Sequence, residues 1–306
     1  MISVETEWKE FLKNLESKTS KAHFKNVCGY SRNYILPFCG DRDLYSMKIA
    51  DWQRIINSAR KHDGSPLSKK TVTHIKETIS SFLIFCDAND IPIKTSTRLL
   101  YVPRNLYSSE RIILQPDEIV LLFASNSSFA HDWYINLFRF LLLTGLRPSE
   151  ALGLQRNDIH KGIALSINRG VIRSRAISST KNKNAKRVIG LSEQAQKVLK
   201  SQLSQISELD TIWIFPNLEG GISSQSTVSK HWRRIAQELG TEAVMYGLRH
   251  TYASIMKDRI SEYMFKLVLG HSANMSSYKI YAHFLNGDTE RYISTASNIF
   301  REFLDF

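Results

Sequence analysis

The chain has 306 residues, of which 42% are hydrophobic and 23% are charged. This composition is typical of a folded globular protein and excludes a disordered chain. Lysine and arginine number 41 against 29 acidic residues, so the formal net charge is +12. Such an excess favours a polyanionic partner, with nucleic acid ahead of an anionic membrane surface. A basic protein without such a partner is the alternative that charge alone leaves open.

Targeting and redox signals are few. The three cysteines, Cys28, Cys39 and Cys86, show no C-x-x-C spacing, so neither a disulfide framework nor a zinc site is predicted. The N-terminus is acidic and unlike a signal peptide. No apolar run reaches the ~20 residues of a membrane span. We therefore expect a cytoplasmic protein with no membrane partner.

Residues 1–92 predict a helical domain. Apolar residues recur at helical spacing from Trp8, and Ser20 and Ser68 stand where helix N-caps are expected. Lys69 and Lys70 open the last of these helices, where the N-terminal amides add to their charge. They are candidate phosphate contacts, although a solvated helix face is the simpler interpretation.

Residues 93–111 predict an interdomain linker. The periodicity stops near Asn89, and Pro92 and Pro103 favour extended backbone. The segment is basic and includes Lys94 and Arg98, which could follow a DNA backbone.

Residues 112–292 predict a second domain of mixed structure. A helix begins near Pro116, and the apolar run 133–143 predicts a buried helix. Strands are expected at 164–167, 170–172 and 212–215. A β-hairpin is expected from 177–180 and 187–191, with Lys181 and Lys183 in its basic tip. Helices follow at 193–203 and 226–239, the latter carrying Lys230 and Arg233, which are further candidate DNA contacts. The predicted fold class is mostly α with a small antiparallel sheet (α+β).

A group of residues in this second domain suits phosphodiester cleavage by a tyrosine. Two arginines can hold the non-bridging oxygens with bidentate forks that stay charged. A lysine can protonate the leaving oxygen, and a phenol can attack once it loses its proton. The chain offers Arg147, Arg249, Lys181, His271 and Tyr281 in those roles. No P-loop, no G-x-G-x-x-G and no acidic metal cluster occurs, so neither metal nor ATP is expected as a cofactor.

These motifs resemble the tyrosine recombinases, a family that includes phage integrases and Xer-like proteins. T-G-L-R-P-S-E resembles the first arginine box and Y-G-L-R-H the second, which assigns Arg147 and Arg249. L-G-H-S assigns His271, and Y-K-I-Y-A-H-F assigns Tyr281 as nucleophile, with Tyr278 as its rival. The family's hairpin lysine would be Lys181, although Lys183 and Lys186 lie nearby. The resemblance covers residues 112–290 and implies that residues 1–92 are a core-binding domain.

One position departs from the family pattern. Three residues before the second arginine the family usually carries histidine, and here Tyr246 stands instead. A phenol can donate a hydrogen bond to a phosphate, but it does not exchange a proton near neutral pH as imidazole does. His250 is not expected to replace it.

The resemblance implies a site-specific recombinase that works through a 3′-phosphotyrosine and a Holliday junction. Its partners would be a double-stranded recombination site and other copies of itself, as a dimer on a site and a tetramer in a synapse. Accessory DNA-bending or directionality factors are also expected, and the location would be the nucleoid of a prokaryotic host. The alternative is a catalytically weak DNA-binding relative with a structural or regulatory role. A type IB topoisomerase or hairpin-forming resolvase would share the chemistry.

Residues 293–306 predict an apolar C-terminal helix directly after the nucleophile segment. Ile293, Ala296, Phe300 and Phe303 recur at helical spacing. One interpretation is that this tail docks into a neighbouring protomer and senses its state. The other is that the helix folds back onto its own domain.

Overall fold

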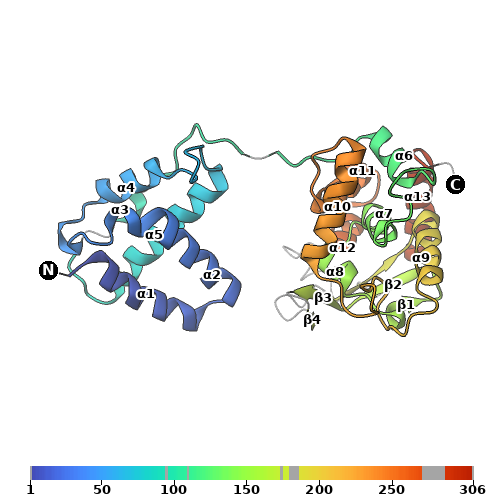
Figure 1. The fold of residues 1–306 in the computed structure, drawn as a ribbon, viewed down its shortest axis with the longest axis horizontal. Helices are drawn as coiled ribbons and strands as arrows, with labels where there is room; N and C mark the ends of the chain where they lie inside the picture. Colours follow the sequence, from blue (N-terminus) through green and yellow to red (C-terminus); the bar gives the residue numbers. More distant parts are fainter. Residues whose placement is uncertain are drawn as a thin grey trace. The chain divides into compact units, whose positions relative to one another are not determined.

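A computed structural model describes residues 2–93, 96–108, 110–172, 175–178, 186–270 and 287–304. The chain forms two compact units, residues 1–110 and 111–306 (Figure 1). Both are mainly helical, and the second also contains small antiparallel sheets. The α+β class predicted from the sequence is therefore confirmed. No helix in the described parts of the chain has the length and apolar character that spanning a bilayer requires.

The first unit is a bundle closed around aromatic side chains. Its α-helices are α1 (Val4–Lys18), α2 (Lys21–Tyr30), α3 (Leu36–Cys39), α4 (Ile49–Ser58) and α5 (Lys69–Ala88). Ser20 and Ser68 cap α2 and α5 as expected, because each hydroxyl accepts from a first-turn amide. In the core, the rings of Trp8 and Phe82 lie 4.3 Å apart between centroids, and Trp52 stacks beside them at 6.3 Å from Trp8. These aromatic contacts fix how α1, α4 and α5 pack.

Much of the segment that the sequence predicts as a linker folds onto this first unit. Leu100 is buried, and Val102 and Leu106 pack against the same core. The side chain of Gln53 pairs with the backbone of Tyr101 in both directions, accepting at 3.0 Å and donating at 3.1 Å. Leu100, Val102 and Leu106 therefore pack on this core without helical periodicity, whereas Leu99 and Tyr101 stay exposed. Arg98 is exposed in the short 3₁₀ turn Thr97–Leu99.

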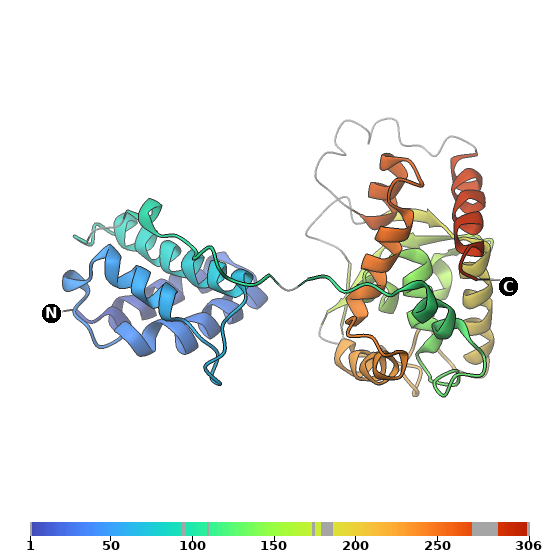
Figure 2. The ribbon, with the colours of Figure 1, turned by 90° about the horizontal axis from the view of Figure 1, so that it is seen from above.

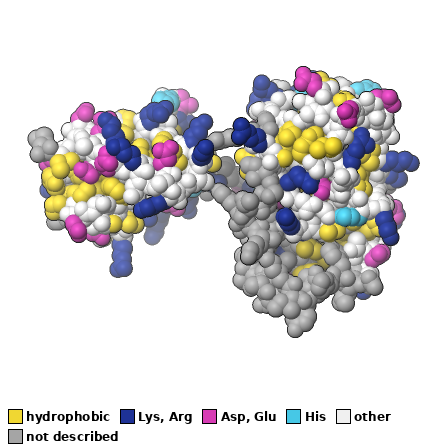
Figure 3. Space-filling model, turned by 90° about the horizontal axis from the view of Figure 1, so that it is seen from below, with side chains coloured by type: hydrophobic (Ala, Val, Ile, Leu, Met, Phe, Trp, Pro, Cys, Tyr) yellow, Lys and Arg dark blue, Asp and Glu magenta, His cyan; other side chains and the backbone are white. Residues whose placement is uncertain are grey.

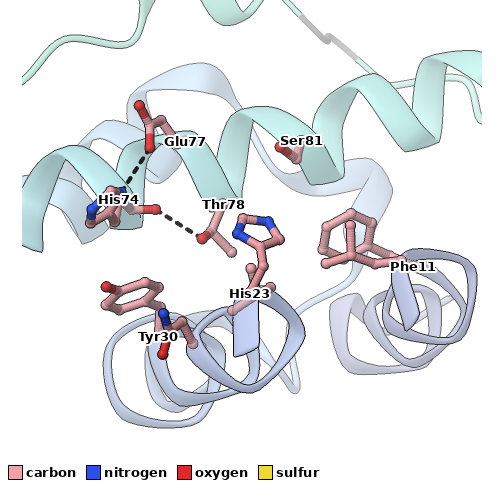
Figure 4. Close-up of a pocket in the computed structure, with 10 residues that line it drawn as sticks. Phe11, His23, Tyr30, His74, Glu77, Thr78 and Ser81 are labelled. Carbon is pink, nitrogen blue, oxygen red and sulfur yellow. Dashed lines mark hydrogen bonds and ion pairs between the residues drawn. The ribbon is translucent and has the colours of Figure 1, made fainter. Parts of the chain in front are cut away.

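A cavity of about 160 Å³ lies between α1, α2 and α5 (Figure 4). His74 and Tyr30 stack across it with ring centroids 5.8 Å apart, and His74 Nδ1 lies 2.9 Å from Glu77 Oε2. His23 and Phe11 also line it. The cavity belongs to the first unit and contains none of the residues predicted to take part in catalysis.

The second unit is built around one buried helix. Its α-helices are α6 (Pro116–Phe123), α7 (Ile135–Thr144), α8 (Pro148–Leu152), α9 (Glu193–Gln205), α10 (Gln225–Leu239), α11 (Met245–Met256), α12 (Glu262–Leu269) and α13 (Asp288–Arg301). Every residue of α7 except Arg139 is buried. The helix packs against α8, α9 and α11 (Figures 1 and 2). The buried helix that the apolar run predicts is thus the centre of this unit.

The strands pair differently from the expected hairpin. β1 (Ile159–His160), β2 (Ala164–Ile167) and β5 (Arg187–Gly190) form one antiparallel sheet in the order β1-β2-β5, and β3 (Arg169–Ile172) pairs with β4 (Arg175–Ser178). The predicted hairpin between 177–180 and 187–191 is therefore wrong, since β4 pairs with β3 and β5 with β2. Ile172, at the end of β3, pairs with Arg175, at the start of β4. Such a short connection favours pairing of strands that are consecutive in the sequence. β5 instead buries Ile189 in the core of the unit.

The strand expected at 212–215 reduces to a single bridge. Trp213 pairs with Gln155, and the amide of Ile214 donates to Leu154 O at 3.0 Å. This segment thus crosses the end of α8 without joining either sheet.

The C-terminal helix α13 packs on its own unit. Tyr292, Ala296 and Phe300 are buried in the core of that unit, and Ser297 Oγ accepts from the amide of Glu193 at 2.9 Å. Figure 2 shows α13 in red beside α9. This arrangement matches the interpretation in which the helix expected at 293–306 folds back onto its own domain. Docking to a second protomer stays a prediction.

Candidate active site

The turn that carries the first predicted arginine depends on a glycine. α7 ends at Thr144 and is capped by Gly145, whose φ of 63° lies in the left-handed region that L side chains rarely adopt. A Cβ at this position would lie 2.3 Å from Cδ1 of Tyr252. Both the conformation and the close approach of the Tyr252 ring therefore require glycine. The chain then restarts as α8, with Arg147 at the N-cap and Pro148 at the first helical position.

Arg147 is oriented from two sides. Its Nη1 donates to Glu150 Oε1 at 2.8 Å, and its backbone amide donates to Glu150 Oε2 at 3.0 Å. Its Nη2 donates to the carbonyl oxygen of Gly270 at 3.2 Å. One carboxylate thus holds both the backbone and the side chain of this residue. The Arg147 side chain is 33% exposed, so part of it still faces solvent.

A third arginine, Arg187, shares that carboxylate and was not among the residues predicted to take part in catalysis. Its Nη2 and Nη1 donate to the two oxygens of Glu150 at 2.9 Å and 3.2 Å, and its Nε donates to Val268 O at 3.1 Å. Its side chain is only 1% exposed. The signal was present in the sequence. In R-V-I-G-L, Arg187 alternates with Ile189 and Leu191, and an arginine on the apolar face of a strand must be paired.

Arg249 lies in the middle of α11 and is buried at 4% exposure. Its Nη1 donates to Gly145 O at 2.7 Å, and its Nη2 donates to Leu269 O at 2.6 Å. The carbonyls of Val268, Leu269 and Gly270 therefore each accept from a different arginine. The C-terminal end of α12 carries partial negative charge, which favours such cations. The fold gathers three guanidinium groups at this helix end.

The electrostatics of the site follow from this crowding. Burial, and then the nearby charge of Arg147, lower the pKa of Arg249 to about 10, so it is still protonated at neutral pH. Burial alone would raise the pKa of Glu150, but hydrogen bonds and charge from Arg187 and Arg147 outweigh it and leave the pKa below its ordinary value. An anion that bound beside Arg249 would relieve the repulsion between the guanidinium groups.

Tyr246 lies in the first turn of α11 with 39% of its surface exposed. The Arg249 guanidinium carbon lies 6.0 Å from the centre of its ring. His250 packs edge-on against Tyr246 with ring centroids 5.1 Å apart. Burial and the charges of Arg111 and Arg249 lower the pKa of His250, which favours the neutral imidazole. The exposed phenol is thus accessible beside the buried arginine.

Three predicted catalytic residues, Lys181, His271 and Tyr281, lie outside the described residues. Their neighbours along the chain are described. Gly270, which precedes His271, ends α12 with φ 60° and leaves no room for a side chain: a Cβ there would lie 2.9 Å from Nη1 of Arg187. Lys186, the described alternative to Lys181, is exposed immediately before β5.

The predicted DNA contacts lie in both units. Lys69 and Lys70 are exposed in the first turn of α5, and Lys230 and Arg233 are exposed on α10. Lys94 and Lys183 lie outside the described residues. On the faces seen in Figure 3, basic side chains lie scattered among acidic and hydrophobic ones. Exposure permits these residues to contact a phosphate backbone, which is what their predicted role requires.

Comparison with known proteins identifies the class to which this fold belongs. The phage integrase family matches residues 113–287, which is more than half of the chain. The chain therefore belongs to the phage integrase family, and the resemblance to tyrosine recombinases drawn from the motifs is confirmed. The "Probable integrase/recombinase" of Acholeplasma phage L2 is 22% identical over 251 residues, which cover 80% of this chain and 79% of that protein.

Solved structures show the same fold at low sequence identity. The Tn1549 transposon integrase, in complex with a circular intermediate DNA, matches with a TM-score of 0.78 at 15% identity, covering 95% of this chain and 98% of that one. A lambda integrase dimer bound to a core site matches with a TM-score of 0.68 at 18% identity, covering 89% and 96%. A lambda integrase tetramer bound to a Holliday junction matches with a TM-score of 0.67 at 17% identity, covering 90% and 79%.

Proposed function

We propose that this protein is a site-specific DNA recombinase that cuts and rejoins strands through a covalent 3′-phosphotyrosine formed by Tyr281. The observation that carries the proposal is the convergence of Arg147 and Arg249 on the last two carbonyls before His271. These two cations are held in place beside the start of the segment that carries His271 and Tyr281. Such an arrangement suits the binding and cleavage of one scissile phosphate. Membership of the phage integrase family supports the same assignment.

The reaction then follows from charge and proton balance. The Tyr281 oxygen attacks phosphorus and the bond to the 5′ oxygen breaks, leaving a phosphotyrosine at the 3′ end. Arg147 and Arg249 bind the non-bridging oxygens, where negative charge develops in the transition state. Lys181 protonates the leaving 5′ oxygen, and the phenol proton passes to a nearby base. Because the phosphotyrosine conserves the energy of the ester, a 5′ hydroxyl of another strand reverses the step without ATP or metal.

Tyr246 and His271 complete the proposed site. Tyr246 is exposed beside Arg249 and can donate its phenol proton to a phosphate oxygen. A phenol at this position serves as a hydrogen-bond donor and does not exchange a proton near neutral pH as an imidazole does. His271 would then be the imidazole available to exchange protons in the site.

The proposed partners are a duplex recombination site and further copies of this chain. Full recombination joins four strands through a Holliday junction, so it needs four active sites, a dimer on each duplex and a tetramer in the synapse. The dimer and tetramer complexes of lambda integrase support this. Lys69, Lys70, Arg98, Lys230 and Arg233 would contact the DNA backbone. Accessory DNA-bending or directionality factors would act with it on the nucleoid in the cytoplasm.

The test begins with the target DNA. Fragments of DNA flanking the coding sequence are incubated with the protein and denatured in detergent, and fragments that remain attached to protein are sequenced. A duplex nicked next to the mapped cleavage point then traps the intermediate, because the short fragment carrying the 5′ hydroxyl diffuses away. Wild type should accumulate a covalent adduct. Tyr281→Phe should bind the same DNA and form none, whereas its matched control Tyr278→Phe should still form it.

The outcomes separate the alternatives. Loss of the adduct in Tyr278→Phe alone would move the nucleophile to that residue. DNA binding with no adduct in wild type would support the second candidate, a catalytically weak DNA-binding relative. That candidate is favoured by Tyr246 standing where the family usually has histidine. Relaxation of supercoils without exchange between two sites would indicate a topoisomerase-like activity.

A further inference from the structure

Two buried tyrosines join the helix of the second arginine to the C-terminal helix. The hydroxyl oxygens of Tyr252, on α11, and Tyr292, on α13, lie 2.7 Å apart. Both side chains are in the core, with exposures of 0% and 4%. In such a pair one phenol donates and the other accepts. Neither hydroxyl has a role in the proposed reaction, so the presence of this buried polar pair needs another explanation.

The Tyr252 ring supports the backbone that orients Arg249. It packs so closely on Gly145 that a Cβ there would fall 2.3 Å from its Cδ1. The carbonyl oxygen of Gly145 accepts from Arg249 Nη1 at 2.7 Å. A shift of this ring would therefore move the turn at Gly145, and with it one of the two acceptors described for this guanidinium. Ring, turn and arginine form one chain of direct contacts.

Tyr292 also touches the strand of the third arginine. Its Cδ1 would lie 3.1 Å from a Cβ placed on Gly190, so its ring packs closely on β5. Three residues earlier, β5 carries Arg187, whose guanidinium holds both oxygens of Glu150. Glu150 in turn orients Arg147. Tyr292 thus contacts α11, which carries Arg249, and β5, whose Arg187 holds the carboxylate that orients Arg147.

We propose that Tyr292 is a positioning residue, which fixes the Tyr252 ring beneath Gly145 and thereby sets the orientation of Arg249. The inference rests on the proposed function, because it assigns Tyr292 a part in orienting the arginines of that reaction. If the Tyr292 hydroxyl is removed, the Tyr252 hydroxyl is left buried without this partner, and a buried hydroxyl without a partner is costly. The Tyr252 ring then moves toward another acceptor and carries the Gly145 turn with it.

α13 offers a matched control for loss of stability alone. Ser297, on the same helix, accepts from the amide of Glu193 on α9 and donates to Ile293 O at 2.6 Å. It is buried like Tyr292, but its described bonds are to α9 and its own helix. Ser297→Ala therefore removes a buried hydroxyl from α13 without disturbing Tyr252 or Gly145. Tyr252→Phe combined with Tyr292→Phe removes both members of the pair and leaves neither hydroxyl unpaired.

The first measurement compares cleavage with binding on the nicked suicide duplex. With protein in excess, Tyr292→Phe should form the adduct about 10-fold more slowly, less than the ~10²-fold cost of a 1 Å misplacement, with unchanged half-site affinity. The double variant should restore most of the rate, and Ser297→Ala should keep the wild-type rate. A wild-type rate in Tyr292→Phe would overturn the inference. So would equal slowing by Ser297→Ala, or a double variant as slow as the single one.

A second measurement does not depend on cleavage. The Nε–Hε resonance of Arg249 is assigned by its loss in Arg249→Lys and followed by nuclear magnetic resonance in the full chain. It should shift in Tyr292→Phe, return toward its original position in the double variant and stay in place in Ser297→Ala. An unmoved resonance in Tyr292→Phe would refute the positioning role even in a protein that cleaves. A wild-type protein that binds DNA and forms no adduct would refute the proposed reaction, and the resonance would still decide the role of Tyr292.

Discussion

Glu150→Gln should destabilise the second unit far more than an ordinary loss of one ion pair. Glu150 accepts from Arg187 at 2.9 Å and 3.2 Å and from the side chain of Arg147 at 2.8 Å. Its side chain is 10% exposed and that of Arg187 is 1% exposed. The substitution keeps the shape but removes the negative charge, so a guanidinium remains in the core without its carboxylate.

Breaking a buried pair on one side costs about 3–5 kcal/mol, because the partner charge stays desolvated. The bond to Arg147 adds little, since exposed pairs contribute about 0–1 kcal/mol and the Arg147 side chain is 33% exposed. We expect the lower end of the range, about 3 kcal/mol, because the glutamine oxygen can still accept from one arginine. Replacing both members by apolar side chains, as in Glu150→Leu with Arg187→Met, should cost less than the sum of the single variants.

Hydrogen exchange in increasing urea, followed by mass spectrometry, measures the free energy of unfolding of each unit separately. Peptides from α7 and α8 report the second unit, and peptides from α5 serve as an internal control. Glu302→Gln is the matched variant, since it makes the same change in an exposed pair with Arg259. It should cost less than about 1 kcal/mol. A Glu150→Gln loss no larger than that of Glu302→Gln would refute the buried network.

The pH dependence gives the same network a second signature. The pKa of Glu150 is lower in the folded protein than its ordinary value of 4.5. Its contribution to stability is therefore present above pH 4.5 and is lost as pH falls through the folded pKa. Glu150→Gln should reduce the slope of stability against pH in that acid range. An unchanged slope would mean that other carboxylates cause it.

Three further results are expected. Tyr246→Phe should slow adduct formation, whereas Tyr246→His should retain the rate. Equal rates for Tyr246→Phe and wild type would mean that the Tyr246 ring only packs and that its hydroxyl has no part in the reaction. Gly145→Ala should lose at least about 2 kcal/mol, from a left-handed conformation and a clash with Tyr252, and a variant of wild-type stability would contradict both. Burial raises the pKa of Tyr252, and it raises that of Tyr292 to about 12. Their neutral forms stabilise the fold fully below the usual pKa of about 10 and lose that effect as pH rises toward 12. The Tyr252→Phe, Tyr292→Phe double variant should therefore lose less stability than wild type over that alkaline range in urea titrations.

The motifs and most helices could be read from the sequence because they depend on neighbours along the chain. Helix caps such as Ser20 and Ser68 act within three residues, and the stripe from Trp8 follows the helical period. The apolar run 133–143 predicted the central helix of the second unit, which begins and ends within two residues of it. The arginine boxes likewise led to the family that the comparison confirmed.

The sequence did not decide how strands pair or where an apolar segment without a period is buried. Both β4 and β5 were predicted as strands, yet their partners depend on which face reaches the core. Leu100 and Leu106 follow no helical period, so nothing local showed that the segment predicted as a linker packs on the first unit.

For the candidate site, the sequence determined which residue types are present, and the tertiary structure decided what holds them. Arg147 could be recognised beside Glu150, but its bond to Gly270 joins residues 123 positions apart. Arg187 reaches Glu150 across 37 positions and Tyr252 reaches Tyr292 across 40. A charge or hydroxyl that is buried needs a hydrogen-bond partner, and this need can be predicted from the position of the residue in the sequence pattern. Which partner it finds depends on elements brought together by folding, because hydrogen bonds act over about 3 Å in space whatever the separation along the chain.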